Sequence, residues 1–146
     1  MGASIGVGLG MRHVLPKDEA KKVVSVIGDS TFVHSGLTGL AEMAYNVPET
    51  GHVVLIVDNS TTAMTGMQEH PGTGLTLDRK PTNKLDYEAV ARAMNIQNVA
   101  TFDPMKQGEE FEQALLDAMD KDELTVLIVK RPCIIAASRK RRKANV

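Results

Sequence analysis

Three near-continuous apolar runs constrain the fold of this 146-residue chain more than any other feature. They cover residues 23–27, 53–57 and 124–129 and consist mainly of valine, isoleucine and leucine. Strands that are buried on both faces have this pattern, because helices cover both sides of a parallel sheet. Residues 97–102 predict a weaker fourth strand, which ends at Asp103-Pro104 because proline has no N–H for strand pairing.

One-sided apolar stripes between these runs predict helices. The stripes consist of Leu37, Leu40, Ala41 and Ala44, then Tyr87, Val90, Ala91 and Met94, then Phe111, Leu115, Leu116 and Met119. A further helix is expected before the first strand. This order predicts an α/β three-layer domain with a mainly parallel sheet. We expect one domain over residues 1–137, followed by a basic tail over 138–146, because a chain of this length builds one core.

Charge and cysteine content exclude several function classes. The chain has 17 Lys and Arg against 18 Asp and Glu, so composition gives no reason to expect a nucleic-acid partner. The single cysteine, Cys133, excludes an internal disulfide and any cysteine-ligated cluster built from this chain alone. The apolar runs are far shorter than a bilayer span. We therefore expect a soluble cytoplasmic protein without a membrane segment.

The first apolar run ends on Gly28-Asp29-Ser30, a triplet that fits two unrelated chemistries. In a serine hydrolase Ser30 would be the nucleophile, whereas in a diphosphate cofactor site Asp29 would bind a metal. Hydrolases with this triplet resemble one another in an Asp-x-x-His near the C-terminus, which supplies the base. The chain has no Asp-x-x-His and its last histidine is His70, so the hydrolase is the weaker interpretation.

Asn59 follows the second apolar run, thirty residues after Asp29. Parallel strands joined by a right-handed crossover end at one edge of the sheet, where ligands of open α/β sheets bind. If the two strands are neighbours, the Asp29 carboxylate and the Asn59 amide oxygen converge on one hard cation. Mg²⁺ prefers such oxygen ligands and takes others from phosphate and water.

Two segments near this edge complete the predicted site. Ser30 and Thr31 are expected to lead toward a helix over 36–46, whose N–H groups can hold anionic oxygens and whose cap is Ser35. Residues 60–84 form a connection rich in Thr, Gly, Pro and Met. Compact domains rarely contain a loop of this length unless it has a function.

Four segments together carry a family resemblance. These are "MGASIGVGLGM", "GDSTFVHSGLTGL", "DNSTTAMTGMQEHPGTG" and "LDYEAVARAMNIQNV". They resemble the thiamine-diphosphate-binding domain of the 2-oxoacid ferredoxin oxidoreductases, in particular the alpha subunit of indolepyruvate ferredoxin oxidoreductase. The resemblance spans about residues 1–133, and residues 64–68 are similar to the family's Met-Thr-Gly-Gly-Gln. Ser30 stands where the family's diphosphate motif has glycine. The implied fold is the thiamine-diphosphate-binding α/β fold.

The resemblance implies a role for several residues. Asp29 and Asn59 would bind Mg²⁺ through side-chain oxygens and Thr61 through its backbone carbonyl. Gly28, Ser30 and Thr65 would contact the cofactor. The candidates for handling the substrate are His34, Gln68 and His70, although a structural hydrogen bond is an equally good interpretation of either histidine. We expect His13 and His52 at the surface.

The implied reaction is oxidative decarboxylation of an aryl pyruvate, with the acyl group passing to coenzyme A and electrons to iron–sulfur clusters and ferredoxin. One cysteine cannot build such a cluster, and no glutamate here lies in a pyrimidine-binding motif. The clusters and a pyrimidine-binding domain would therefore belong to missing segments or partner subunits, within an oligomer. The alternatives are a non-catalytic thiamine-diphosphate-binding or assembly module and, more distantly, the serine hydrolase. We expect the loop over 60–76 to be mobile without cofactor and ordered with it.

Overall fold

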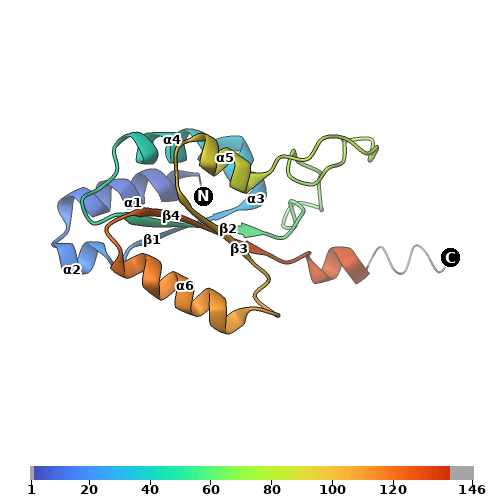
Figure 1. Ribbon diagram of the computed structural model, residues 1–146. Helices are drawn as coiled ribbons and strands as arrows, with labels where there is room; N and C mark the ends of the chain where they lie inside the picture. The colour runs from blue at the N-terminus through green and yellow to red at the C-terminus, as the bar shows by residue number, and fades with distance from the viewer. Residues whose placement is uncertain (1, 139–146) are drawn as a thin grey trace.

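Four parallel strands form the centre of the computed structural model, which describes residues 2–138 (Figure 1). They are β1 (Val24–Gly28), β2 (His52–Asp58), β3 (Asn98–Phe102) and β4 (Leu124–Lys130), in the spatial order β1-β2-β4-β3. Each neighbouring pair is parallel. The three apolar runs and the weaker fourth segment are thus confirmed as strands of an α/β fold. The basic run over 139–143 lies outside the described residues.

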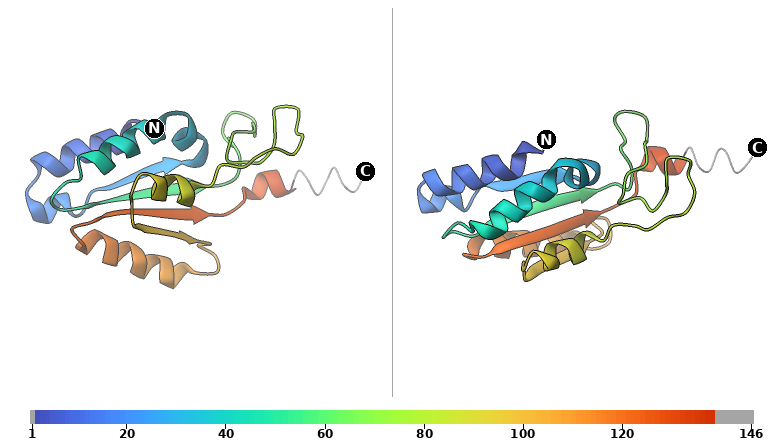
Figure 2. Two further views of the ribbon diagram at one scale, coloured as in Figure 1. Left: turned by 45° about the horizontal axis from the view of Figure 1, so that its top comes forward. Right: turned by 90° about the horizontal axis from the view of Figure 1, so that it is seen from above.

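Helices cover the two faces of the sheet unequally (Figure 2). α1 (Ala3–Val14), α4 (Leu37–Tyr45) and α5 (Tyr87–Ala93) lie on one face, and α6 (Gly108–Asp120) lies on the other. The short α2 (Lys17–Ala20) links α1 to β1. The larger core cluster lies under the first three helices and includes Ile5, Ile27, Phe32, Leu40, Met43, Val54, Ile56, Tyr87, Ala91, Val126 and Ile128. A smaller cluster of Val53, Ala118 and Leu127 packs against α6.

The predicted stripe of α6 is wrong at one position. Leu116 is 51% exposed, whereas Phe111, Leu115 and Met119 pack against the smaller core cluster. Ala118 is buried in its place. Leu116 therefore lies outside the buried face of α6. The apolar spacing alone did not show which of the adjacent residues Leu115 and Leu116 faces the core.

The helix after β1 begins seven residues earlier than the sequence predicted. α3 (Asp29–Thr31), the π-helical turn η1 (Phe32–Gly36) and α4 follow one another without a break, so the helix starts at Asp29. Ser35 is not its cap, because its hydroxyl donates to the carbonyl of Thr31 at 3.1 Å. Phe32 is fully buried, so core packing holds residues of low helix propensity in helical conformation. π-helical turns are frequent at functional sites.

A buried polar chain fixes α1 on the sheet. Nε of Arg12 donates to Nδ1 of His52 at 2.9 Å, so Nε2 of the neutral ring carries the proton and faces the Ser25 hydroxyl at 2.7 Å. Burial lowers the pKa of His52 to about 4, and the Arg12 charge acts in the same direction. The prediction that His52 lies at the surface is therefore wrong, whereas His13 is exposed as expected.

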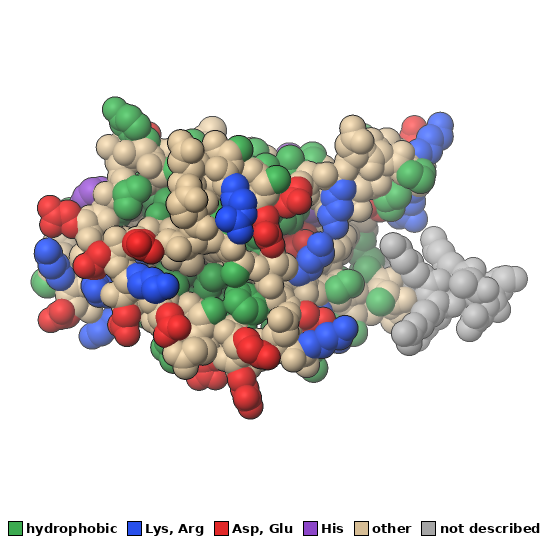
Figure 3. Space-filling view, in the orientation of Figure 1, with side chains coloured by type: hydrophobic (Ala, Val, Ile, Leu, Met, Phe, Trp, Pro, Cys, Tyr) green, Lys and Arg blue, Asp and Glu red, His purple; other side chains and the backbone are tan. Residues whose placement is uncertain are grey.

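The surface carries both signs of charge. On the face drawn in Figure 3, acidic and basic side chains are interspersed over the helices and loops. This mixture agrees with the formal net charge of −1 for the whole chain. Within residues 2–138, no helix has the length and apolar character needed to cross a membrane.

Candidate functional site at the carboxyl edge of the sheet

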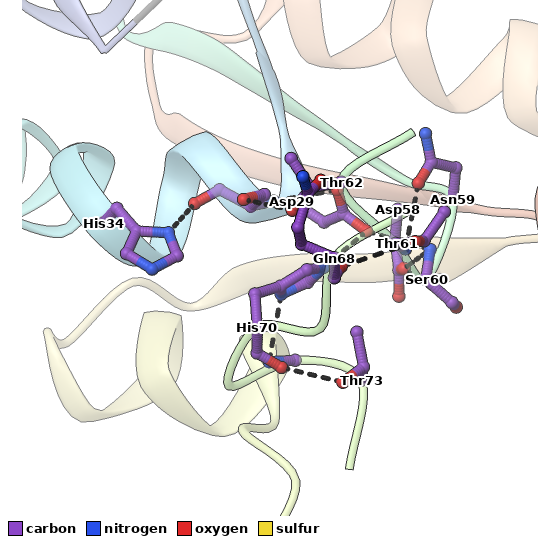
Figure 4. Close-up of polar contacts among 12 residues, drawn as sticks. Asp29, His34, Asp58, Asn59, Ser60, Thr61, Thr62, Gln68, His70 and Thr73 are labelled. Carbon is purple, nitrogen blue, oxygen red and sulfur yellow. Dashed lines mark hydrogen bonds and ion pairs between the residues drawn. The ribbon is translucent and has the colours of Figure 1, made fainter. Parts of the chain in front are cut away.

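The turns that follow β1 and β2 meet at one edge of the sheet. β1 and β2 are neighbours, with Gly28 paired to Val57 in the parallel register. The Asp29 carboxylate accepts the N–H of Ser30 on Oδ1 and the N–H of Ser60 on Oδ2, both at 2.8 Å (Figure 4). A buried carboxylate is therefore held between the two turns.

A second buried carboxylate lies beside Asp29. Asp58, the last residue of β2, is 1% exposed, and its Oδ1 accepts the N–H and the hydroxyl of Ser60 at 2.8 and 3.1 Å. Its Oδ2 has no hydrogen-bond partner within the described chain. Burial raises the pKa of Asp29, the hydrogen bond from Ser30 and the nearby His70 oppose this, and Asp58 adds to it. Asp58 was not among the predicted residues, although a carboxylate that closes a buried apolar run was an available signal.

The long loop after β2 returns to Asp29 at His70. His70 is 4% exposed, and its Nε2 lies 3.3 Å from Oδ2 of Asp29 without forming a hydrogen bond. Nδ1 of His70 accepts the N–H of Gly72 at 3.2 Å. Because an accepting ring nitrogen carries no proton, the neutral ring is assigned its proton on Nε2, facing Asp29.

The predicted metal ligands Asn59 and Thr61 lie on the turn after β2. The amide oxygen of Asn59 accepts the N–H of Thr61 at 3.0 Å, a contact typical of tight turns, and it keeps a second lone pair. Thr61 is buried. The next residue, Thr62, donates its hydroxyl to the Ser30 hydroxyl at 2.8 Å. Ser30 is thereby joined to the same turn.

Thr65 and Gln68 lie further out on the loop. The Thr65 hydroxyl donates to the side-chain oxygen of Gln68 at 2.8 Å, and the Gln68 amide donates to the Thr65 carbonyl at 2.6 Å. Both residues are exposed. The two side chains therefore bond to each other across a small turn of the loop.

His34 is exposed on η1 and differs from His70 in its tautomer. Its Nδ1 lies 2.7 Å from the backbone carbonyl oxygen of Ser30. Because a carbonyl oxygen only accepts, Nδ1 carries the proton and Nε2 is left as an acceptor in the neutral ring. Of the two histidines proposed for proton transfer, His34 is thus the accessible one.

The loop between β2 and α5 contains two hairpin-like segments that extend past the sheet edge (Figure 1). Antiparallel bridges join Thr62 to Gln68 and Leu75 to Pro81. Met64 and Leu77 near the two tips are 97% and 88% exposed. The loop is thus ordered by its own backbone contacts, and its predicted mobility without cofactor stays a prediction.

A cavity of about 520 Å³ opens beside Asp58. It lies between the ends of β2, β4 and β3 and the start of α5 and is lined by Asp58, Lys84, Leu85, Asp86, Tyr87, Glu88, Thr101, Ile128 and Lys130. β2 leads to α5 on one face of the sheet, whereas β3 leads to α6 on the other. Ligands of open α/β sheets bind at such points of divergence.

The chemistry of this edge fits a hard divalent cation. Asp29 and Asp58 are both buried, and within residues 2–138 neither carboxylate forms an ion pair with a Lys or Arg side chain. Buried carboxylates without a compensating charge are costly. The described residues contain no group of three His, Cys, Asp or Glu able to hold a metal alone. A cation here would therefore also need amide, carbonyl or ligand oxygens, which Mg²⁺ accepts.

A parallel α/β domain with an acidic edge between two neighbouring strands is the class of protein that the fold and the site define. Residues 1–129 match the family described as thiamine pyrophosphate enzyme, C-terminal TPP binding domain. The chain belongs to this family.

Within this family, the chain is similar to curated subunits of one kind of oxidoreductase. The chain is 38% identical over 143 residues to the indolepyruvate oxidoreductase subunit IorA of Archaeoglobus fulgidus, covering 98% of this chain and 22% of the relative. The subunit IorA of Pyrococcus horikoshii is 37% identical, covering 92% of this chain and 22% of the relative. That of Methanothermobacter thermautotrophicus is 32% identical, covering 94% and 21%. The chain thus spans about a fifth of the length of these relatives.

Proposed function

We propose that this chain holds the Mg²⁺-diphosphate end of thiamine diphosphate in an oxidoreductase that decarboxylates aryl 2-oxoacids such as indolepyruvate. The observation that carries the proposal is the buried pair Asp29 and Asp58 at the carboxyl edge, with which no Lys or Arg within residues 2–138 forms an ion pair. The family match supports the cofactor, and the likeness to IorA subunits supports the substrate class.

The roles of the individual residues follow from their positions. The side-chain oxygens of Asp29 and Asn59 and the backbone carbonyl of Thr61 bind Mg²⁺. Asp58 adds negative charge beside the cation, where its unpaired Oδ2 contributes to the favourable field. Gly28 and Ser30 contact the diphosphate, and Thr65 contacts the cofactor from the long loop.

When bound, thiamine diphosphate supplies the electron sink for decarboxylation, so the protein contributes position, charge and proton transfer. His34 presents Nε2 as an acceptor on η1, directly after the diphosphate turn, and can take or return a proton there. Gln68, held by Thr65, presents polar atoms from the loop for orienting the substrate carboxylate.

The remaining parts of the reaction belong to other polypeptide segments. Because the chain spans 22% of its relative from Archaeoglobus fulgidus, a pyrimidine-binding domain and the iron–sulfur clusters lie on further segments or partner subunits. Ferredoxin would accept the electrons, and coenzyme A the acyl group. The assembly would be a cytoplasmic oligomer.

The surroundings of Ser30 disfavour the serine hydrolase. Its hydroxyl contacts the hydroxyl of Thr62, and the imidazole of His34 contacts the backbone carbonyl of Ser30 instead of its hydroxyl. A serine nucleophile needs a base on its hydroxyl.

Calorimetric titration with thiamine diphosphate, with and without Mg²⁺, tests the proposal. We expect saturable binding only when Mg²⁺ is present, with about 2.7 kcal/mol of added stability at a hundredfold excess over Kd. Absence of binding under both conditions would refute it. The assembled enzyme should then oxidise indolepyruvate faster than pyruvate; cofactor binding without turnover in the full assembly would indicate the non-catalytic module.

A further inference from the structure

The carboxylate of Asp29 is contacted from three separate parts of the chain. Ser30 reaches it from the turn after β1, Ser60 from the turn after β2, and His70 from the middle of the long loop. The first two donors are backbone N–H groups, which the strand ends fix in place. His70 contributes a side chain instead, and it lies on the long loop between β2 and α5.

The ring of His70 is held in one orientation. Its Nδ1 accepts the N–H of Gly72, and its backbone carbonyl accepts the N–H and the hydroxyl of Thr73 at 2.8 and 2.9 Å. A Cβ at Gly72 would overlap the hydroxyl of Tyr87 and lie 3.0 Å from the His70 ring. The turn over 70–73 is therefore pressed against α5, which directs Nε2 of His70 toward Asp29.

We propose that His70 is a positioning residue for Asp29 and couples the long loop to the cation. This inference rests on the proposed function, in which Asp29 is a ligand of Mg²⁺. Nε2 of His70 lies 3.3 Å from Oδ2 of Asp29 without a hydrogen bond in the ligand-free chain. A small shift of the loop on cation binding would let an Nε2–H donate to the carboxylate and leave its remaining lone pairs to the cation. A neutral imidazole suits this task because it leaves the full negative charge of Asp29 for the metal, whereas Lys or Arg would compete with it.

The coupling is reciprocal. If closure of the loop places His70 against Asp29 and so favours cation binding, cation binding must favour loop closure by the same free energy. Through His70, the conformation of the loop over residues 60–84 therefore depends on whether the metal site is occupied. The role of His70 differs from that of His34, whose accessible Nε2 suits proton transfer.

Two substitutions distinguish the effect of the N–H group of His70 from the effect of its imidazole ring. In His70→Gln the side-chain amide can place an N–H near the position of Nε2, and in His70→Asn the amide is too short to reach Asp29. His13→Gln, on the exposed face of α1, is the matched control. Two quantities are measured: Mg²⁺ affinity at a fixed thiamine diphosphate concentration, and the rate of proteolytic cleavage within 60–84 in the ligand-free chain. Circular dichroism checks that each variant folds.

We expect His70→Asn to bind Mg²⁺ about ten- to a hundredfold more weakly, as is typical when an outer partner of a metal ligand is lost. His70→Gln should bind close to the wild-type value. Cleavage of the ligand-free loop should accelerate in His70→Asn and stay near the wild-type rate in His70→Gln. In an Asp29→Ala background His70→Asn should not accelerate cleavage of the loop any further, because its partner is already absent.

The outcomes distinguish this inference from the proposed function. Wild-type Mg²⁺ affinity in His70→Asn would overturn the positioning role and leave the proposed function standing. A wild-type chain that binds no cofactor would overturn the proposed function. The cleavage rates would then test whether His70 holds the loop against Asp29. Equal cleavage of wild type and His70→Asn in that case would overturn the contact itself.

Discussion

Asp29 and Asp58 share one backbone donor: the N–H of Ser60 lies 2.8 Å from an oxygen of each carboxylate. These carboxylates come from the ends of neighbouring strands, and both are buried. One N–H cannot offset two negative charges. In the proposed function a cation completes this arrangement.

Asp29→Ala should abolish Mg²⁺-dependent binding of thiamine diphosphate. It should also destabilise the ligand-free chain by about 1–3 kcal/mol, because the N–H groups of Ser30 and Ser60 lose their acceptor. Asp103→Ala is the matched control, since Asp103 follows β3 at the same sheet edge and pairs with Arg131. Calorimetry and chemical denaturation measure the two effects. Undiminished affinity in Asp29→Ala would exclude Asp29 as a ligand.

Asn59→Ala should weaken cofactor binding less than Asp29→Ala does. A neutral amide oxygen can be replaced by water around Mg²⁺, whereas a charged ligand cannot. The substitution also removes the acceptor for the N–H of Thr61. The same titration checks this order of effects, and an effect larger than that of Asp29→Ala would contradict it.

Two glycines of α1 should respond to alanine in opposite directions. A Cβ at Gly8 would overlap the Ser25 hydroxyl and lie 2.9 Å from Nε2 of His52, so Gly8→Ala should cost about 1–3 kcal/mol through overpacking. At Gly10 a Cβ meets nothing within 4 Å, and Gly10→Ala should stabilise the helix by about 0.5–1 kcal/mol. Urea denaturation of both variants measures the difference. Equal effects would show that α1 does not sit against the sheet as described.

Stability should fall in mild acid because of His52. Its pKa of about 4 in the folded chain lies below the ordinary value of 6.5, so the unfolded chain binds the extra proton between these values. The contribution is present above pH 6.5 and is lost as pH falls toward 4, amounting to about 3 kcal/mol.

Comparison with His52→Gln isolates this effect. Asp29, whose pKa is raised by burial, contributes with the opposite sign in both proteins and cancels in the difference. The free energy of unfolding, measured from pH 7.5 to 4, should decline more steeply in the wild type. Parallel curves would mean that His52 titrates normally and that its contact with Arg12 is not maintained.

The chain alone should not decarboxylate 2-oxoacids at a useful rate. In the proposed function a glutamate that activates the cofactor would come from a separate pyrimidine-binding domain, and general acid–base catalysis is worth about a hundred- to ten-thousandfold. Carbon dioxide release from indolepyruvate, with thiamine diphosphate and Mg²⁺ supplied, measures this. Robust turnover without a partner would show that the chain contains a complete site.

The strands and their edge were predictable because burial on both faces leaves a local signal in the sequence. The run over 53–57 needed no knowledge of its neighbours, and the short crossover from β1 to β2 made adjacency the simplest topology. Asp29 and the turn at Asn59 were accordingly placed at one edge. The helix start at Asp29 was missed because Asp, Ser and Thr favour turns, and only burial of Phe32 overrides that preference.

Contacts between distant residues left no such signal. His52 is buried because Arg12, 40 positions away, donates to it, and nothing near His52 in the sequence indicates this partner. His70 reaches Asp29 only because the long loop after β2 turns back toward the end of β1 (Figure 4). Asp58 lies one residue beyond the predicted run over 53–57, and its side chain points to the same face as Val54 and Ile56 of the larger core.

The most direct test of the central claim locates the cation itself. Crystals of the chain grown with thiamine diphosphate and Mn²⁺ in place of Mg²⁺ would give an anomalous difference peak. If Asp29 and Asn59 bind the cation, one peak lies at the carboxyl edge of β1 and β2, at about 2.0–2.3 Å from an Asp29 carboxylate oxygen and from the Asn59 amide oxygen, with diphosphate oxygens completing the shell. A peak that lies elsewhere, or a bound cofactor whose diphosphate is held without any cation near Asp29, would contradict this assignment.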